Sequence, residues 1–330
     1  MLKYTKGWNF FAFSDIMLHN RMLLSVFLFM KVAQNELNKG NISMKKDLDC
    51  PYSMIDREII CEHKTARVTP EDINTVHNHD GYEIVFFLRG DVNIMIEPNM
   101  IQMQRGDMFF ISPLVFHGLN LEDISGYERV VINIQYECLK QLGDEETDFS
   151  TLFRSAATPD MNHLRVPEED LPEFIELAEK LQVSMDSKEF GHSVLSKALL
   201  TQFLLLTCKY SSNAPLMKKE SIMPHVVSKI FDYLDTHIEE DITISSMAEA
   251  LHYSSDHLSR VFSEATGDSL KHYINAKKIA LAQKLLLQNY SPYDVCFMVG
   301  YNNYSSFSRR FSKQIGVSPK QFQLSHREAV

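Results

Sequence analysis

The sequence lacks the features that mark several large classes of protein. Its 330 residues include one tryptophan, 12 glycines and 11 prolines, and no segment is of low complexity, which excludes collagen-like and disordered chains. The five cysteines are odd in number and show none of the paired spacings of zinc sites or disulfide frameworks, so we expect a reducing compartment. No nucleophile triad, phosphate-binding loop or cysteine pair indicates an enzyme.

Long hydrophobic runs are also missing. The apolar stretch near the N-terminus, residues 22–30, is bounded by basic residues and is far shorter than the roughly 20 residues of a spanning helix. No small-residue cleavage pattern follows it, so we expect no export, no membrane partner and a cytoplasmic location. Residues 1–50 are interpreted as an N-terminal extension or arm, with Met44 as an alternative start.

Positive charge is scarce overall but concentrated at one end. The formal net charge is −10, from 33 basic and 43 acidic residues. Residues 251–330 hold ten of the basic and five of the acidic residues, which gives this tail +5 and leaves −15 for residues 1–250. An acidic body with a basic tail suggests a nucleic-acid partner for the tail.

The hydrophobic pattern changes along the chain and predicts the α+β class. Residues 51–140 read as an all-β unit because short apolar runs alternate with turn residues. The candidate strands are Tyr82–Leu88, Val92–Ile96, Met108–Ile111 and Val130–Gln135. Residues 141–215 read as a helical linker or dimerisation region, with helices over Leu171–Val183 and Ser193–Tyr210. The apolar run 199–206 must be covered, either by the β unit or by a second subunit.

The tail, residues 221–325, contains an internal repeat. Ser259-Arg260-Val261-Phe262-Ser263 recurs 49 residues later as Ser308-Arg309-Arg310-Phe311-Ser312. In each copy a short helix (Ile244–Leu251; Pro292–Val299), a tight turn and a longer helix (Ser254–Thr266; Tyr304–Ile315) follow the helix-turn-helix plan. The connecting helix, Leu270 to Gln288, spans about 28 Å, close to the roughly 34 Å between successive major grooves.

These motifs resemble the AraC/XylS family of bacterial regulators over His225 to about Gln323. The first-unit pattern is Met247-Ala248-Glu249, Tyr253-Ser254, Leu258-Ser259-Arg260-Val261-Phe262 and Gly267. The second is Val299-Gly300-Tyr301, Phe307-Ser308-Arg309-Arg310-Phe311 and Gly316-Val317-Ser318-Pro319. Lys278 and Gln323 stand where Arg is common, and Cys296 stands where Ala is usual. The changes at Lys278 and Gln323 would each cost a phosphate contact.

The resemblance implies eight base-reading positions. They are Ser254, Asp256, Ser259 and Arg260 in the first unit, and Tyr304, Ser305, Ser308 and Arg309 in the second. Arginine pairs bidentately with guanine, and serine contacts base edges or phosphates. Surface salt bridges are the alternative for Arg260 and Arg309, and assistance to the helix N-terminus is the alternative for Asp256. Arg310 is expected to contact a phosphate or another part of the chain.

Two further motifs resemble those of the cupin barrel. The first runs from His77 through His79 to Glu83 and Gly90, and the second joins Gly106, Pro113 and His117. In the second motif Ser112 and Leu114 replace a Pro and a Gly that are often found there. Cupin enzymes bind Fe, Mn or Zn at the positions of His77, His79, Glu83 and His117.

Sensor barrels fused to such a tail often keep this pattern while binding an organic effector. We therefore expect His77, His79, Glu83 and His117 to bind an effector, with no metal, cofactor or catalytic residue. A bound metal and a merely structural role remain the alternatives. Sugars are the expected effector class, since polyols suit imidazole and carboxylate groups beside Tyr82, Phe86 and Phe109.

The sequence thus predicts a cupin-like sensor barrel, a helical linker and a double helix-turn-helix domain. The expected function is sequence-specific binding of double-stranded promoter DNA by a homodimer that responds to a small molecule. Activation is the commoner mode in the family and would add RNA polymerase as a partner. The alternative is a metal-dependent cupin enzyme with a fused DNA-binding tail.

Overall fold

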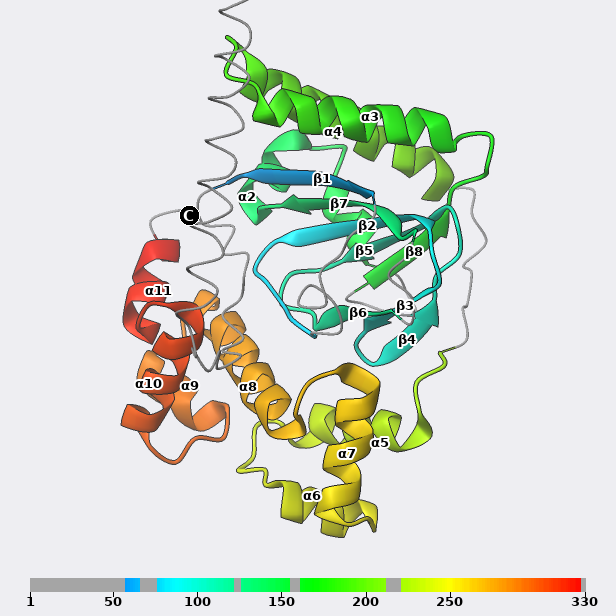
Figure 1. Cartoon of the computed structure of the whole chain (residues 1–330). Helices are drawn as coiled ribbons and strands as arrows, with labels where there is room; N and C mark the ends of the chain where they lie inside the picture. Colours follow the sequence, from blue (N-terminus) through cyan, green and yellow to red (C-terminus); the bar gives the residue numbers. More distant parts are fainter. Residues whose placement is uncertain (1–56, 66–75, 122–125, 155–160, 212–220, 328–330) are drawn as a thin grey trace, which may run out of the picture. The chain divides into compact units, whose positions relative to one another are not determined.

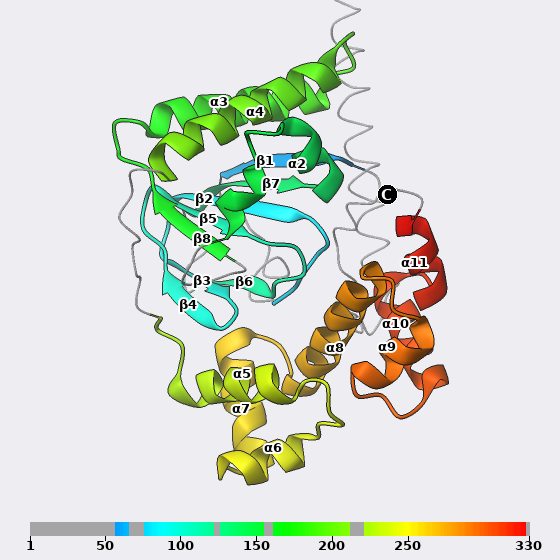
Figure 2. The same ribbon diagram turned by 180° about the vertical axis from the view of Figure 1, so that it is seen from behind.

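The computed structural model describes residues 57–65, 76–121, 126–154, 161–211 and 221–327 (Figures 1 and 2). Antiparallel strands come first and helices follow, which confirms the α+β class. The expected N-terminal arm, Met44 and the linker residues 212–215 lie outside the described residues.

The described strands form two sheets. A five-stranded sheet has the order β1-β7-β2-β5-β8 and a three-stranded sheet the order β4-β3-β6. The strands are β1 (Ile59–Thr65), β2 (Tyr82–Arg89), β3 (Val92–Ile96), β4 (Asn99–Gln102), β5 (Asp107–Ile111), β6 (His117–Leu121), β7 (Glu128–Ile134) and β8 (Met161–Arg165). The four predicted strands are present as β2, β3, β5 and β7.

Strand β8 comes from the range 141–215 that was expected to be helical. It pairs antiparallel with β5, so that Asp107 lies opposite Arg165. A strand of five residues leaves only a weak periodic pattern, and its partner is distant in the sequence. The sequence therefore offered little signal for β8 or for the short strands β4 and β6.

Strand β2 is buried on both faces, which explains its nearly continuous apolar sequence. Ile84, Phe86 and Leu88 belong to the core between the large sheet and the helices. Val85 and Phe87 belong to the core between the two sheets. Alternate residues of a strand point to opposite faces, so β2 separates the barrel interior from the helical layer.

Two long helices cover the large sheet on the side away from the small sheet (Figure 1). They are α3 (Leu171–Asp186) and α4 (His192–Ser211). Phe174 packs between Phe86 and Phe203, at ring-centroid distances of 5.9 and 5.3 Å. Within the apolar run 199–206, Leu200 and Phe203 are buried, whereas Leu205 is exposed. Among the described residues, the barrel and α3 thus cover one side of the run, and Leu205 on the other side is exposed.

The tail folds as two helix-turn-helix units, as the repeat predicts (Figure 2). Its helices are α5 (His225–His237), α6 (Ile244–Leu251), α7 (Ser255–Thr266), α8 (Leu270–Leu287), α9 (Pro292–Met298), α10 (Tyr304–Ile315) and α11 (Pro319–Arg327). Ser254 caps α7, and Gly267 and Gly316 end α7 and α10 in the left-handed conformation. Predicted and observed boundaries agree within one residue.

A buried lysine joins the two units. Lys278 lies in α8, and its Nζ donates to the carbonyl oxygens of Glu240 at 2.5 Å and Gly300 at 3.1 Å. Glu240 follows α5 in the first unit, whereas Gly300 lies in the turn of the second. A neighbouring bond from Asn302 Nδ2 to Asp241 Oδ2, 2.8 Å long, joins the same two turns. The units therefore meet directly as well as sharing α8.

The barrel and the first helical unit are also in contact. Glu97, after β3, forms an ion pair with Lys277 of α8, which also bonds to Asp235 at 2.7 Å. Phe116 packs on Tyr273 of α8 with ring centroids 4.8 Å apart. These residues share one core with α5 and α7. The segment that leads into β6 therefore touches the helical part of the chain that contains α5, α7 and α8.

Replacing Gly300, in the second turn, should lower the stability of the fold because both space and backbone conformation are restricted there. Gly300 and Gly316 both have positive φ, 71° and 85°, so alanine at either position costs about 1–2 kcal/mol. A Cβ at Gly300 would lie 2.2 Å from the Glu240 carbonyl oxygen, whereas Gly316 has open space. We expect Gly300→Ala to lose a further ~1–3 kcal/mol from overpacking, measured by urea unfolding. Equal losses for Gly300→Ala and Gly316→Ala would contradict the close packing of the two turns.

Candidate nucleic-acid interface and effector site

Helix α7 has one buried and one exposed face. Leu258 and Phe262 are fully buried, which leaves Asp256 and Arg260 exposed on the opposite side. The hydroxyl of Ser254 accepts from the backbone N–H of His257, and Ser259 Oγ donates to the Ser255 carbonyl oxygen. The hydroxyl groups of both serines therefore bond within the helix. Asp256 and Arg260 are the charged side chains among these positions that α7 presents to solvent.

Arg260 forms the surface salt bridge that was its alternative role. Its Nη1 lies 3.1 Å from Glu264 Oε1, one helical turn away. An exposed i,i+4 pair is worth only about 0.3–0.5 kcal/mol, less than the 1–3 kcal/mol of a bidentate contact to guanine. The pair therefore does not prevent Arg260 from reaching a base. His257, which the sequence reasoning missed, lies 3.2 Å from the same guanidinium through its Nδ1.

Helix α10 repeats this arrangement. Phe307 and Phe311 are buried, and Ser305 and Arg309 are exposed. Arg309 Nε donates to the Ser305 carbonyl oxygen at 3.2 Å, within its own helix.

Two other predicted positions on α10 are less accessible. Tyr304 is half-buried, with its ring 6.1 Å from that of Tyr293, and Ser308 is also half-buried. Of the eight predicted base-reading residues, five are exposed: Ser254, which caps α7, and Asp256, Arg260, Ser305 and Arg309.

Lys278 and Gln323, which stand where arginine is common in the family, both bond within the chain. Lys278 is only 5% exposed, and burial lowers the pKa of its ammonium group. Gln323 is buried, and its Nε2 donates to the carbonyl oxygens of Leu286 and Tyr290, near the C-terminus of α8. Neither side chain faces solvent, and the loss of a phosphate contact at these positions stays a prediction.

The four predicted effector residues come together at one end of the barrel. One potential ligand atom from each of His77, His79, Glu83 and His117 lies within 4.8 Å of the others. Glu83 Oε2 accepts from His79 Nε2 at 2.6 Å and from His117 Nε2 at 3.2 Å. His77 and His117 exchange two backbone hydrogen bonds of 2.9 Å, which places the fourth residue beside the other three.

The electrostatics of this group are those of a buried ion-pair cluster. Burial alone would raise the pKa of the Glu83 carboxyl group, but the charge and hydrogen bond of His117, with those of His79, hold it well below its usual value. Burial opposes the charge on His117, yet Glu83 raises the pKa of its imidazole. Three imidazoles and one carboxylate could hold a divalent transition metal or bond to the hydroxyl groups of an organic ligand.

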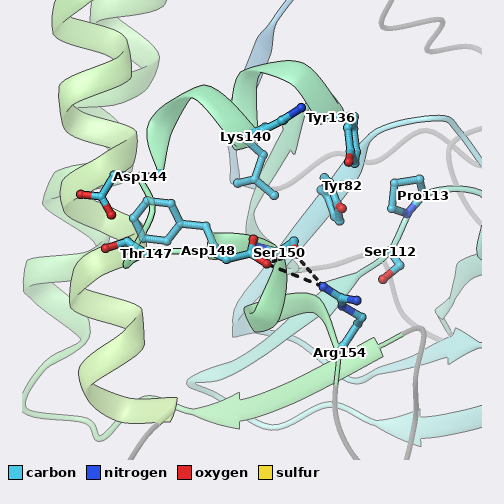
Figure 3. Close-up of a pocket in the computed structure, with 13 residues that line it drawn as sticks. Tyr82, Ser112, Pro113, Tyr136, Lys140, Asp144, Thr147, Asp148, Ser150 and Arg154 are labelled. Atoms are coloured by element: carbon cyan, nitrogen blue, oxygen red, sulfur yellow. Dashed lines mark hydrogen bonds and ion pairs between the residues drawn. The ribbon is translucent and has the colours of Figure 1, made fainter. Parts of the chain in front are cut away.

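The aromatic residues expected beside this cluster are distributed differently. Only Phe109 lies between the two sheets with the cluster. Phe86 belongs to the core under α3 and α4. Tyr82 lines a pocket of about 520 Å³ beside α2 (Tyr136–Leu142) and the 3-10 helix η2 (Phe149–Phe153), shown in Figure 3. Alternation along β2 explains this difference, since Tyr82 and Glu83 point to opposite faces.

Comparisons with known proteins match both halves of the chain. The model of the AraC-like ligand binding domain covers residues 65–204, and that of a helix-turn-helix domain covers residues 247–325. Within the described residues, no helix is long and apolar enough to cross a membrane.

Named relatives cover most of the chain. An uncharacterized HTH-type transcriptional regulator of Staphylococcus aureus strain MSSA476 is 24% identical over 265 residues, which is 78% of this chain and 33% of the relative. The chain thus spans about a third of the length of the first curated relatives it matches. The HTH-type transcriptional activator RhaR of Pectobacterium atrosepticum is 26% identical over 82% of this chain and 92% of its own length.

Two solved structures are also similar. ToxT from Vibrio cholerae is 13% identical, with a TM-score of 0.35, over 81% of this chain and 97% of that chain. The C-terminal domain of AraT, a response regulator from Geobacillus stearothermophilus, is 31% identical, with a TM-score of 0.31, over 32% of this chain and 88% of that chain. From the two matching domain models and their order along the sequence, the chain belongs to the AraC/XylS family, with an AraC-like ligand-binding domain ahead of its helix-turn-helix domain.

Proposed function

We propose that the chain is a cytoplasmic transcription regulator that binds promoter DNA sequence-specifically and responds to a small molecule. The observation that carries this proposal is the duplicated helix-turn-helix, in which α7 and α10 each present an exposed arginine at the same repeat position, Arg260 and Arg309. The basic charge of the tail, +5 over residues 251–330, supports the same partner. The names of the relatives agree, since they describe transcriptional regulators and one activator.

DNA binding would draw on two kinds of interaction. Arg260 and Arg309 would read guanine in the major groove, with Asp256 and Ser305 contributing further contacts to base edges. Ser254, Ser259, Tyr304 and Ser308 would support these contacts at the edges of the two helices. The remaining cations of the tail would contact phosphates, which makes binding salt-dependent but not sequence-specific.

Alanine at either arginine should weaken specific binding. We expect Arg260→Ala and Arg309→Ala each to cost about 1–3 kcal/mol, roughly tenfold to a hundredfold in affinity, on an operator selected from randomised DNA. Fluorescence anisotropy at several salt concentrations measures the effect. Arg105→Ala is the matched control, because Arg105 is an exposed barrel arginine paired with Glu168. The proposed function would be contradicted if the wild type preferred no selected sequence, or if all three variants lost operator affinity equally.

The effector site is proposed at His77, His79, Glu83 and His117. Three of these side chains are buried, and buried polar groups that converge at the end of an apolar barrel are typical of ligand sites. Hydroxyl groups could replace the mutual bonds of Glu83 and the imidazoles, and a carbohydrate is the ligand class proposed. We propose that the cluster binds and does not catalyse. The alternative is a metal-dependent cupin enzyme, for which the donor set is suitable.

A carbohydrate that binds this cluster should stabilise the protein by mass action, by about 2.7 kcal/mol at a concentration of 100 Kd. A thermal-shift screen of monosaccharides measures the effect, and His77→Ala should abolish it, since His77 is the half-buried member of the group. His237→Ala, in α5, is the control. Stoichiometric metal in the purified protein together with turnover would favour the enzyme alternative. A metal-free preparation that still binds DNA would exclude it.

We propose a homodimer through α3 and α4. Val194 and Leu205 are 71% and 47% exposed and lie eleven residues, about three helical turns, apart on α4. Val183 of α3 and Phe190 in the loop between the helices are also exposed. Neighbouring apolar side chains at this density commonly mark an interaction surface. If the dimer activates transcription, RNA polymerase is its further partner, which in vitro transcription from the selected operator would test.

A charge on this surface should dissociate the dimer. Sedimentation equilibrium should give twice the chain mass for the wild type and a monomer, or a weaker dimer by at least tenfold, for Val194→Asp, because a buried unpaired carboxylate is strongly unfavourable. Val317→Asp, at an exposed valine of the tail, should leave the dimer intact. A wild-type chain that sediments as a monomer at micromolar concentration would contradict the proposal.

A further inference from the structure

The pocket beside α2 and η2 is separate from the histidine cluster. Its volume, about 520 Å³, is in the range of small-molecule sites. Tyr82 and Pro113 come from the barrel, Tyr136 and Lys140 from α2, and Arg154 follows η2 (Figure 3). Ser112, Ser150, Thr147 and the carboxylates of Asp144 and Asp148 complete its polar lining. Tyr82 lies on the face of β2 opposite Glu83, so the strand separates the two sites.

The polar groups of the pocket favour a ligand with a carboxylate. Lys140 and Arg154 provide two cations. Arg154 Nη2 donates to Ser150 Oγ at 2.7 Å, but its ion pair with Asp148 is long, at 3.9 Å. The Asp148 carboxylate instead accepts from the backbone N–H and hydroxyl of Ser150, both at 2.9 Å. The second acid of the lining, Asp144, accepts from the backbone N–H of Glu146 at 3.0 Å. Both carboxylates are thus bonded within their own turns, which leaves the Arg154 guanidinium for a stronger charge-assisted partner.

The remaining lining suits a hydroxylated body. The rings of Tyr82 and Tyr136 are nearly parallel, with a 19° interplanar angle and centroids 6.3 Å apart. Aromatic faces of this kind pack against the apolar face of a sugar ring, and the serine hydroxyls can bond to its hydroxyl groups. Burial raises the pKa of the Tyr82 hydroxyl, so it remains a neutral donor. A ring that bears both hydroxyls and a carboxylate, a sugar acid, uses all these groups together.

The pocket borders an unusual backbone segment. Ser112 and Pro113 line it, and the next residue, Leu114, has φ of 65°, which is rare for a residue with a branched side chain. Its N–H donates to the His79 carbonyl oxygen at 2.7 Å. This is the place where the sequence replaces the Pro and Gly of the cupin motif by Ser112 and Leu114. Non-glycine residues in this conformation concentrate at functional sites.

The same segment continues to the helical domain. Two residues beyond Leu114, Phe116 packs on Tyr273 of α8, and His117 belongs to the histidine cluster. We propose that the pocket beside α2 and η2 binds a small sugar acid, held through its carboxylate by Arg154, and that residues 112–117 transmit its binding to α8. The binding stands on the pocket alone, whereas the transmission rests on the proposed DNA-binding function.

Isothermal titration calorimetry on the full chain tests the binding, with D-glucuronate and D-galacturonate as ligands and D-glucose and D-galactose as neutral controls. We expect at least one uronate to bind and its neutral parent to bind at least tenfold more weakly, since the charge-assisted contact is lost. Arg154→Gln should weaken the uronate at least tenfold. Arg105→Gln, at an exposed arginine of the same domain, should not.

Three outcomes would overturn the site: no binding of either uronate, binding of the neutral sugars that Arg154→Gln weakens as much as it weakens the uronate, or an unchanged uronate affinity in Arg154→Gln. The exposed position of Arg154 lets that variant fold, which circular dichroism verifies. Operator binding by the wild type with and without the uronate then tests transmission. A uronate-dependent change in operator affinity that disappears in Arg154→Gln supports transmission. Uronate binding without any change in operator affinity overturns transmission but not the binding site. Loss of DNA binding without ligand bears only on the proposed function.

Discussion

The ammonium group of Lys278 holds the two helix-turn-helix units in a fixed relation. Each unit has its own core, one built around Phe262 and the other around Phe307. Without further contacts, α8 would be their single connection. Lys278 adds a second connection because it binds a carbonyl oxygen from each unit. The spacing of Arg260 and Arg309, the two arginines proposed to contact DNA, depends on this junction.

In the barrel, strand β2 separates two candidate sites. Because β2 is covered on both faces, adjacent residues serve different sites: Glu83 belongs to the histidine cluster and Tyr82 to the outer pocket. Both sites border the segment 112–117, whose Phe116 touches α8. Packed side chains therefore connect both sites, through Phe116, to Tyr273 of α8.

The local sequence predicted the helical tail well. The 49-residue repeat, the cap Ser254 and the glycines at the ends of α7 and α10 depend on residues close together in the chain. The β part was predicted less completely. Strands β4, β6 and β8 are short, and β6 and β8 pair with strands from other parts of the sequence, which periodicity alone does not reveal.

The sequence by itself determined the family, the two recognition helices and the group formed by His77, His79, Glu83 and His117, since motif spacing carries that information. Only the tertiary structure decided what Lys278 and Gln323 do, because their carbonyl partners lie 22 to 38 residues away. It also decided that Tyr82 faces Arg154 in a separate pocket. Contacts between distant residues follow from how the elements pack, and no local pattern records them.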